Sequence, residues 1–408
     1  MKQMIKRAIM ERVLQLAECF PVVMVCGPRQ VGKTTVLKEI CGKISDDIEY
    51  ITFDDLQERY QAQDDPKSFL QRHSAPMLID EFQYVPDILS CIKMDVDLHQ
   101  ENGMYFLTGS QMFSMMRNAG ESLAGRVGIL DLYSFSYSEI IGRENTAFLP
   151  EIDVKKYTDI KQRSLLEVFE HIFRGSMPKV VTTPNLTAVD YYRGYVRTYI
   201  ERDIRDMINA KYERKYLRFL SCMAARAGQE FIASELAKEA EVDNKTVNNW
   251  VSILETTGIV YMMQPYFSNM LKRITKRQRI YFLDTGLVCY LNMFQDAKAA
   301  EASSMSGSLF ENYVISEIIK GYAFAGMDPR RYLYYYRDNN QKEIDLLIQK
   351  NGKLYPIEIK KNTSPGAKAV KNFSVLDGME VGAGAVICMT DVPAKLSDQV
   401  ITIPVDCI

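Results

Sequence analysis

The stretch Gly27-Pro28-Arg29-Gln30-Val31-Gly32-Lys33-Thr34-Thr35 decides the fold of this chain. It follows PVVMVC at residues 21–26, an apolar, β-branched run of the kind that forms a buried strand. A glycine-rich loop that follows a strand and ends in Gly-Lys-Thr is the Walker A pattern. The backbone amides of such a loop bind nucleotide phosphates, the lysine reaches the β- and γ-phosphates, and the threonine hydroxyl ligates magnesium. Residues 27–35 therefore predict a site for ATP and Mg²⁺.

The segments around this loop alternate between strand and helix patterns from residue 21 to about residue 141. The strand patterns are the runs IEYITFDD, PMLIDE, MYFLTGS and RVGILDLYSF. Strands that alternate with helices form a parallel sheet with helices on both faces. We therefore expect an α/β fold class, with a P-loop domain built on a parallel sheet over residues 1–145.

Two of these strand patterns end in polar side chains suited to ATP hydrolysis. Asp80 and Glu81 end the run LIDE, where Asp80 is expected to hold the magnesium through water and Glu81 to polarise the attacking water. An acidic pair in a solvated loop is the other interpretation. The next strand ends in LTGS, and the hydroxyl of Ser110 either senses the γ-phosphate or caps the following helix.

The motifs GPRQVGKTT, LIDEFQ, FLTGSQ, ESLAGRV and YIERDI resemble those of AAA-type ATPases. More closely, the chain is similar to bacterial and archaeal ATP-binding proteins that join an AAA domain (type 14) to a domain of unknown function 4143. This resemblance covers nearly the whole chain. It implies that Arg126 neutralises charge on the transferring phosphoryl group as a catalytic arginine. A surface arginine paired with Asp131 or Glu121 is the alternative.

Between about residues 160 and 227 the apolar residues follow a helical period throughout. We therefore expect a helical section over residues 146–227. A winged helix-turn-helix pattern follows, in a module over 228–295. Asn244 is expected to cap its second helix, and Trp250 to lie in the core. A basic run at residues 272–279 suits contacts with DNA phosphates. Roles in oligomerisation or as a lid are the alternative for this module.

Three carboxylates and a lysine are expected to come together near the C-terminus. Glu358 and Lys360 are one strand period apart in YPIEIKK, so they share a face. An Asn351-Gly352 turn folds the strand of Asp345 back beside them. Glu311 faces inward from the preceding helix and completes the set.

This order, a helical Glu, a strand Asp and then Glu-x-Lys, resembles the restriction-endonuclease-like PD-(D/E)xK fold, although Ile344 stands where that signature often has Pro. The resemblance implies a mixed α/β, nuclease-like domain over residues 296–408. Converging carboxylates can hold Mg²⁺, and a lysine beside them can stabilise a hydroxide or the pentavalent phosphate. We therefore expect the three carboxylates as metal ligands and Lys360 as a catalytic group. Charged residues on the exposed face of an amphipathic strand are the alternative.

The composition limits the partners and the compartment. Fifty Lys and Arg against 52 Asp and Glu give a net charge of -2, so a contact with nucleic acid must come from a local patch. The eight cysteines are scattered without a CxxC pair, which argues against a zinc ribbon and gives no disulfide framework. The longest apolar runs are far shorter than the ~18 residues of a membrane span. We expect a reduced, cytoplasmic protein without a membrane partner.

Together these patterns favour an AAA-type ATPase coupled to a nuclease-like domain that acts on DNA, and a homo-oligomer is compatible with them. The alternative is a nucleotide-dependent switch whose C-terminal domain binds a partner or nucleic acid without cleavage. A nucleotide kinase is disfavoured, because Asp80 and Glu81 suit the activation of water and no acceptor-binding lid is visible.

Overall fold

Five parallel strands form the sheet of the N-terminal domain, in the order β2-β3-β4-β1-β5. The computed structural model describes residues 5–109, 123–158, 160–200, 213–267, 277–338 and 340–408. The strands are β1 (Val22–Cys26), β2 (Glu49–Thr52), β3 (Met77–Asp80), β4 (Tyr105–Thr108) and β5 (Val127–Asp131). The described helices around them are α1 (Met10–Cys19), α2 (Lys33–Ile44), α3 (Leu56–Asp64), α4 (Pro66–Arg72) and α5 (Ile88–His99).

The central strand β1 is covered on both faces, which explains its continuous apolar sequence. Val23 and Val25 belong to a hydrophobic cluster with side chains of α1 and α2. Val22, Met24 and Cys26 belong to a second cluster with side chains of α5. A strand buried on both faces has no position for a polar side chain. The α/β fold with a parallel sheet that the sequence predicts is confirmed.

A mostly helical section follows the short helix α7 (Tyr137–Ile140). Its described helices are α8 (Leu165–Arg174), α9 (Pro178–Thr182), α10 (Ala188–Tyr195), α12 (Glu213–Ala225), α13 (Ala233–Ala240), α14 (Asn244–Thr256), α16 (Thr285–Leu291) and α17 (Ala297–Ala302). Between α14 and α16 lies an antiparallel strand pair, β6 (Val260–Met263) and β7 (Arg279–Phe282).

The start of α14 differs by one residue from the sequence prediction. Asp243, and not Asn244, is the N-cap, because its carboxylate accepts a hydrogen bond from the backbone N–H of Thr246 at 2.8 Å. The prediction for Trp250 is confirmed, since this residue is 1% exposed. Its ring lies 5.1 Å from that of Tyr216, centroid to centroid. Trp250 therefore joins α14 to α12.

The C-terminal sheet is mixed, with the strand order β12-β11-β10-β9-β8. Its strands are β8 (Leu333–Arg337), β9 (Glu343–Lys350), β10 (Lys353–Lys360), β11 (Gly384–Cys388) and β12 (Val400–Pro404). Strands β9 and β10 form the predicted hairpin around Asn351 and Gly352. Both turn residues have positive φ, 52° and 77°, as a type I′ turn requires.

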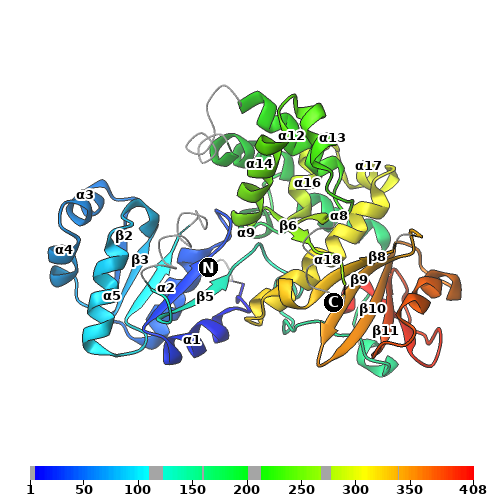
Figure 1. Cartoon of the computed structure of the whole chain (residues 1–408), viewed down its shortest axis with the longest axis horizontal. Helices are drawn as coiled ribbons and strands as arrows, with labels where there is room; N and C mark the ends of the chain where they lie inside the picture. Colours follow the sequence, from blue (N-terminus) through cyan, green and yellow to red (C-terminus); the bar gives the residue numbers. More distant parts are fainter. Residues whose placement is uncertain (1–4, 110–122, 159, 201–212, 268–276, 339) are drawn as a thin grey trace.

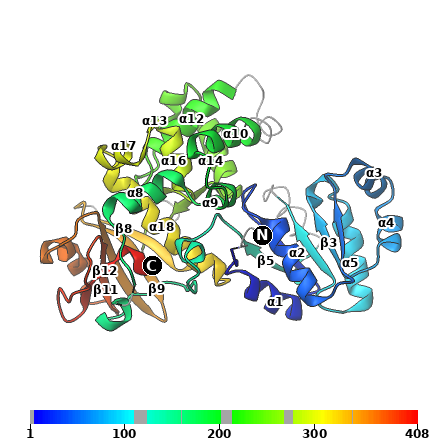
Figure 2. The ribbon, with the colours of Figure 1, turned by 180° about the vertical axis from the view of Figure 1, so that it is seen from behind.

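Helix α18 (Ser306–Phe324) lies between these parts of the molecule. In Figure 1 the blue and cyan N-terminal sheet, the green helical section and the orange-to-red C-terminal sheet surround it, and Figure 2 shows the same arrangement from behind. One hydrophobic cluster extends from α1 through the helical section and α18 to the C-terminal sheet. The parts thus share a core. Among the described residues, no helix combines the length and the apolar character needed to cross a bilayer.

His171 of α8 is partly buried beside this shared core. Its ring lies 5.4 Å from the ring of Tyr137 and 5.5 Å from that of Tyr313, centroid to centroid. Burial lowers the pKa of His171, and the positive charges of Arg163 and Lys320 lower it further. The folded protein therefore keeps this imidazole neutral at a pH where an unfolded chain would protonate it.

We expect the stability of the fold to decrease as the pH falls below about 6.5, the ordinary pKa of histidine. There the unfolded chain binds a proton at His171 that the folded chain does not, which costs up to about 1.4 kcal/mol per pH unit. Denaturant unfolding at pH 7.5 and 5.5 measures the loss, and His171→Gln should reduce it. The exposed His99→Gln is the control. Equal pH dependence of wild type and His171→Gln would contradict the assignment.

Candidate functional site

The phosphate loop joins β1 to α2 and approaches the end of β5 closely. Gly27 has a φ of 136°, and a Cβ there would lie 1.9 Å from the carbonyl oxygen of Leu132, so only glycine fits. Gly32, with a φ of 92°, is the N-cap of α2. The buried ammonium of Lys33 donates to the carbonyl oxygens of Gly27 and Pro28 at 3.0 and 2.8 Å. Burial lowers the pKa of Lys33 to about 8, and an anion beside it would favour the charged form.

Thr34 and Asp80 are in direct contact at the ends of α2 and β3. The Thr34 hydroxyl donates to the carboxylate of Asp80, 3.0 and 2.9 Å from its two oxygens. The hydroxyl of Tyr50, on the neighbouring strand β2, donates to the same carboxylate at 3.2 Å. Hydroxyl and carboxylate oxygens are the ligands that Mg²⁺ prefers. The two residues predicted to bind the metal are therefore together.

Glu81 follows in a left-handed conformation, with a φ of 54°, which is strained for a residue with a side chain. The side-chain amide of Gln83 donates to its carboxylate. Strand β4, which contains Leu107 and Thr108 of the LTGS sequence, lies between β3 and β1. Ser110 itself lies outside the described residues. Sequence reasoning passed over Thr108, whose buried hydroxyl oxygen has no hydrogen-bond partner among the described residues.

The helical section contacts the outer side of the phosphate loop. The hydroxyl of Tyr191 in α10 donates to Oε1 of Gln30 at 2.9 Å. A Cβ at Gly258, after α14, would lie 2.9 Å from Cδ of Pro28. The remaining loop residues are Val31, which is buried, Arg29, which is half-buried, and Thr35, which is exposed.

Arg126 lies at the opposite edge of the sheet from the phosphate loop. It directly precedes β5, which is parallel to β1, and its carbonyl accepts from the N–H of Val22 at the start of β1. The phosphate loop follows the other end of β1, roughly 15 Å away at ~3.3 Å per residue. The guanidinium binds Asp97 of α5, with Nη2 3.0 Å from Oδ2. The partner is therefore not Asp131, and Glu121 lies outside the described residues.

In the C-terminal sheet, Asp345, Glu358 and Lys360 meet where β9 pairs with β10. The ammonium of Lys360 lies 3.1 Å from Oδ2 of Asp345 and 2.7 Å from Oε2 of Glu358. The backbone N–H of Ile359 also donates to Oδ2 of Asp345, at 2.9 Å. Both carboxylates are buried. A lysine ammonium thus occupies the position between two buried carboxylates.

Glu311 reaches the same region from α18 and is held by strand β7. Its Oε1 accepts a hydrogen bond from the hydroxyl of Tyr281 at 2.7 Å and lies 3.4 Å from Nη1 of Arg279. Arg279 also pairs with Glu343 of β9 and lies over the ring of Tyr335. Arg279 belongs to the basic run that was predicted to contact DNA, but the residue is 5% exposed. That assignment is wrong for this residue, because its charge is neutralised inside the protein.

Burial raises the pKa of both Glu311 and Glu358, and the negative charge of Asp345 raises them further. Burial alone would lower the pKa of Lys360, but the charges of Asp345 and Glu358 outweigh this effect and raise it. Oε1 of Glu358 is buried without a hydrogen-bond partner among the described residues. Within the described ranges, no three His, Cys, Asp or Glu side chains are grouped so that they could hold a metal ion. In this conformation Lys360 supplies the positive charge instead.

The rest of the predicted DNA-binding surface is described only in part. Arg277 is exposed and pairs with Glu230, with 3.5 Å between Nη1 and Oε2. Lys245, near the start of α14, is exposed. The other basic residues of the run, Lys272, Arg273 and Lys276, lie outside the described residues.

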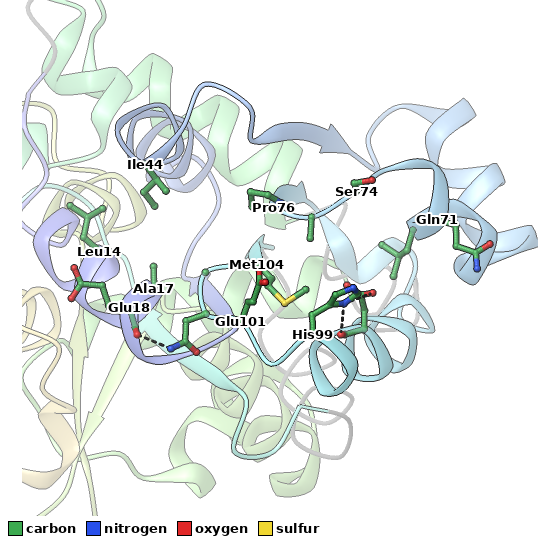
Figure 3. A pocket seen from close by; sticks show the side chains of 15 residues that line it. Leu14, Ala17, Glu18, Ile44, Gln71, Ser74, Pro76, His99, Glu101 and Met104 are labelled. Carbon is green, nitrogen blue, oxygen red and sulfur yellow. Dashed lines mark hydrogen bonds and ion pairs between the residues drawn. The ribbon is translucent and has the colours of Figure 1, made fainter.

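A pocket of about 620 Å³ opens elsewhere in the N-terminal domain (Figure 3). Its lining includes Pro76 and Met104, which directly precede β3 and β4, together with Glu18 and His99. These are the amino ends of parallel strands, whereas the phosphate loop follows the carboxyl end of β1. The pocket is therefore separate from the nucleotide site.

Comparison with known families supports the resemblance to proteins that join an AAA domain to DUF4143, and it does not show a restriction-endonuclease-like domain. Residues 20–141 match the family described as AAA domain, and residues 306–408 match a domain of unknown function, DUF4143. Residues 165–298 match a further domain of unknown function, DUF8612. The AAA and DUF4143 parts of the prediction are confirmed.

Similar proteins occur in bacteria and archaea. Uncharacterized protein Rv2008c of Mycobacterium tuberculosis is 27% identical over 387 residues, which are 95% of this chain and 80% of that protein. Uncharacterized protein MJ1637 of Methanocaldococcus jannaschii is 22% identical over 324 residues, 68% of this chain and 67% of that protein.

Two solved structures are also similar. The Walker-type ATPase PABY2304 of Pyrococcus abyssi has a TM-score of 0.40 and 16% identity, over 70% of this chain and 95% of its own. The RuvB Holliday junction branch migration motor of Thermotoga maritima has a TM-score of 0.31 and 14% identity, over 62% and 87%. The family matches, and not these weaker likenesses, decide the assignment: the chain contains an AAA domain and a C-terminal DUF4143 domain.

Proposed function

We propose that the protein binds ATP with Mg²⁺ and hydrolyses it at the phosphate loop. The observation that carries this proposal is the contact between the Thr34 hydroxyl and both carboxylate oxygens of Asp80. It brings two oxygen ligands suited to Mg²⁺ together at the first turn of the helix that Lys33 begins. The match of residues 20–141 to the AAA domain supports the same function.

Each group of this site has a distinct task in hydrolysis. Lys33 and the loop amides neutralise the phosphate charge. Thr34 would hold Mg²⁺ directly and Asp80 through water, and the bound ion neutralises charge on the phosphates. Glu81 accepts a proton from the water whose oxygen bonds to the γ-phosphorus as ADP leaves. Because Arg126 is far from its own loop, a role in the transition state requires a second copy of the chain, so the proposal includes a homo-oligomer.

We further propose that the C-terminal cluster is a restriction-endonuclease-like site that cleaves DNA with a divalent metal. The donor chemistry fits such an ion, because Asp345 and Glu358 present buried carboxylates and Oε1 of Glu358 lacks a partner within the described structure. These two residues, with Glu311, would hold the ion after Lys360 moves its ammonium aside. The bound ion supplies an activated water, and Lys360 stabilises the hydroxide or the pentavalent phosphate.

The predicted winged-helix module over residues 228–295 would supply DNA contacts through exposed groups such as Lys245. One observation favours a second function, a nucleotide-dependent switch without cleavage. Lys360 already occupies the position of a cation between the carboxylates, so the cluster is stable as a purely structural ion-pair network. In that case the C-terminal domain binds a partner or nucleic acid only.

For the ATP site, Lys33→Ala is expected to weaken ATP binding about a hundredfold, because a hydrogen bond between charged groups is worth about 1.5–3 kcal/mol. Glu81→Gln should keep the affinity and lower kcat by about 10²–10⁴-fold, since only the proton acceptor is lost. Calorimetric titration and phosphate release measure the two effects. The exposed Glu101→Gln should behave as wild type. Hydrolysis by Glu81→Gln at the parent rate would assign the proton transfer to another group.

For the C-terminal cluster, Asp345→Asn and Lys360→Met should each abolish cleavage of plasmid DNA that Mg²⁺ or Mn²⁺ stimulates. The first removes a charged ligand and the second the ammonium, while ATP turnover should persist because the sites lie in different sheets. Lys353→Met, at the exposed start of β10, is the matched control. If the wild-type protein cleaves no form of DNA or RNA, with or without ATP, the switch function replaces this proposal.

A further inference from the structure

Arg7, in the segment before α1, is a buried arginine that contacts the phosphate loop. It is 4% exposed, and all three guanidinium nitrogens have partners. Nη1 donates to the carbonyl of Val31 inside the loop at 2.8 Å, and Nη2 donates to the carbonyl of Tyr133 after β5 at 2.8 Å. Nε donates to Oε1 of Glu139 at 3.0 Å. A planar guanidinium can fix three segments in this way, whereas a lysine ammonium lacks the rigid fork.

Glu139, the partner of Arg7, accepts hydrogen bonds at both of its carboxylate oxygens. The side chain of Glu139, in α7, is 1% exposed. Its Oε1 also accepts from the N–H of Ala8 at 2.7 Å, and its Oε2 accepts from the N–H of Ser136 at 3.0 Å, which completes a capping box. A buried ion pair is tolerated when further hydrogen bonds satisfy both charges. Arg7 and Glu139 meet this condition, so they form a defined and rigid contact.

The segment between β5 and α7 is bound from its other side by helix α18. The ammonium of Lys320 donates to the carbonyl of Phe135 at 2.9 Å, and Glu317 accepts from the N–H of Tyr137 at 2.6 Å. Lys320 and Glu317 also pair with each other at 2.8 Å, and both are buried. The same helix carries Glu311 into the C-terminal cluster. Polar contacts joined by the backbone of residues 133–137 therefore link the phosphate loop to the helix of that cluster.

We propose that Arg7 is a positioning residue of the phosphate loop and that its pair with Glu139 couples this loop to α18. The inference rests on the proposed ATP site and adds to it a residue outside the Walker motifs. Arg7 holds the Val31 carbonyl in place before nucleotide binds. The loop therefore loses less conformational entropy on binding, which favours a higher affinity. Bound nucleotide adds its own restraint to the loop, and Arg7 and Glu139 transmit this restraint to the segment that α18 holds.

The test measures the affinity of the full chain for a non-hydrolysable ATP analogue with Mg²⁺. Arg7→Lys and Arg7→Met should each weaken binding about tenfold, as the loss of a charge-assisted hydrogen bond predicts. Arg7→Met combined with Glu139→Met should lose no more affinity, since both sides of the contact are already absent, and it leaves no buried charge unpaired. The matched control is Lys6→Ala, which removes the exposed neighbouring pair with Glu11 and should leave the affinity unchanged.

Amide hydrogen exchange tests the coupling directly, in the wild-type protein and in the double variant. In the wild-type protein, the analogue should slow exchange at residues 135–141 and in the second half of α18, as well as in the phosphate loop. In the double variant, slowing should remain in the phosphate loop and disappear from α18. These are different segments, so a general loss of stability cannot imitate the pattern.

The outcomes separate the inference from the proposed function. If the wild-type protein binds no nucleotide, the ATP site itself is wrong. If it binds nucleotide but α18 exchanges at the same rate, the coupling is overturned whatever the variants do. If all Arg7 variants bind with the parent affinity and only melt at lower temperature, Arg7 has a structural role alone, and its positioning role is refuted.

Discussion

Helix α18 is buried along almost its whole length, so each polar side chain on it needs a partner inside the protein. Asn312 donates to the carbonyl and accepts from the N–H of Phe282 in β7, both at 2.8 Å. Glu317 and Lys320 form hydrogen bonds with the backbone that follows β5. Glu311 accepts a hydrogen bond from the hydroxyl of Tyr281 in β7. Two distant segments, strand β7 and the backbone that follows β5, are thus placed by the hydrogen-bond requirements of one helix.

This dependence makes the C-terminal cluster a property of more than the C-terminal domain. Glu311 is oriented by Tyr281 and Arg279, which belong to β7 and precede the DUF4143 match at residues 306–408. Arg279 also contacts Glu343, so β7 links α18 to β9 through a single guanidinium. Buried charges in contact with each other need all their partners, because a partner removed leaves an uncompensated charge. Strand β7 therefore helps to hold the charged groups of the C-terminal cluster in position.

The sequence predicts those features whose partners are close along the chain. Glu358 and Lys360 share a face because strand geometry dictates it, and the hairpin turn then brings Asp345 beside them. Contacts between residues that are far apart along the chain could not be predicted in this way. Nothing in the run around Arg279 shows that its charge is neutralised by α18 and β9, and nothing near Arg7 points to the phosphate loop. In both cases the side chain is of a type that usually stays on the surface, and only the tertiary contacts reverse that expectation.

The charges of the C-terminal cluster explain how its buried carboxylates are accommodated inside the protein. Arg279 pairs with both Glu311 and Glu343. In a count of charges, Glu230 and Glu343 are balanced by Arg277 and Arg337, which leaves Glu311, Asp345 and Glu358 against Arg279 and Lys360. One negative charge is in excess, and a proton can neutralise it because burial raises the pKa of two of these carboxyls. In the proposed nuclease, a divalent cation in place of the proton would leave one positive charge in excess. A phosphodiester carries one negative charge, so it would be attracted to the cluster only when the metal is bound.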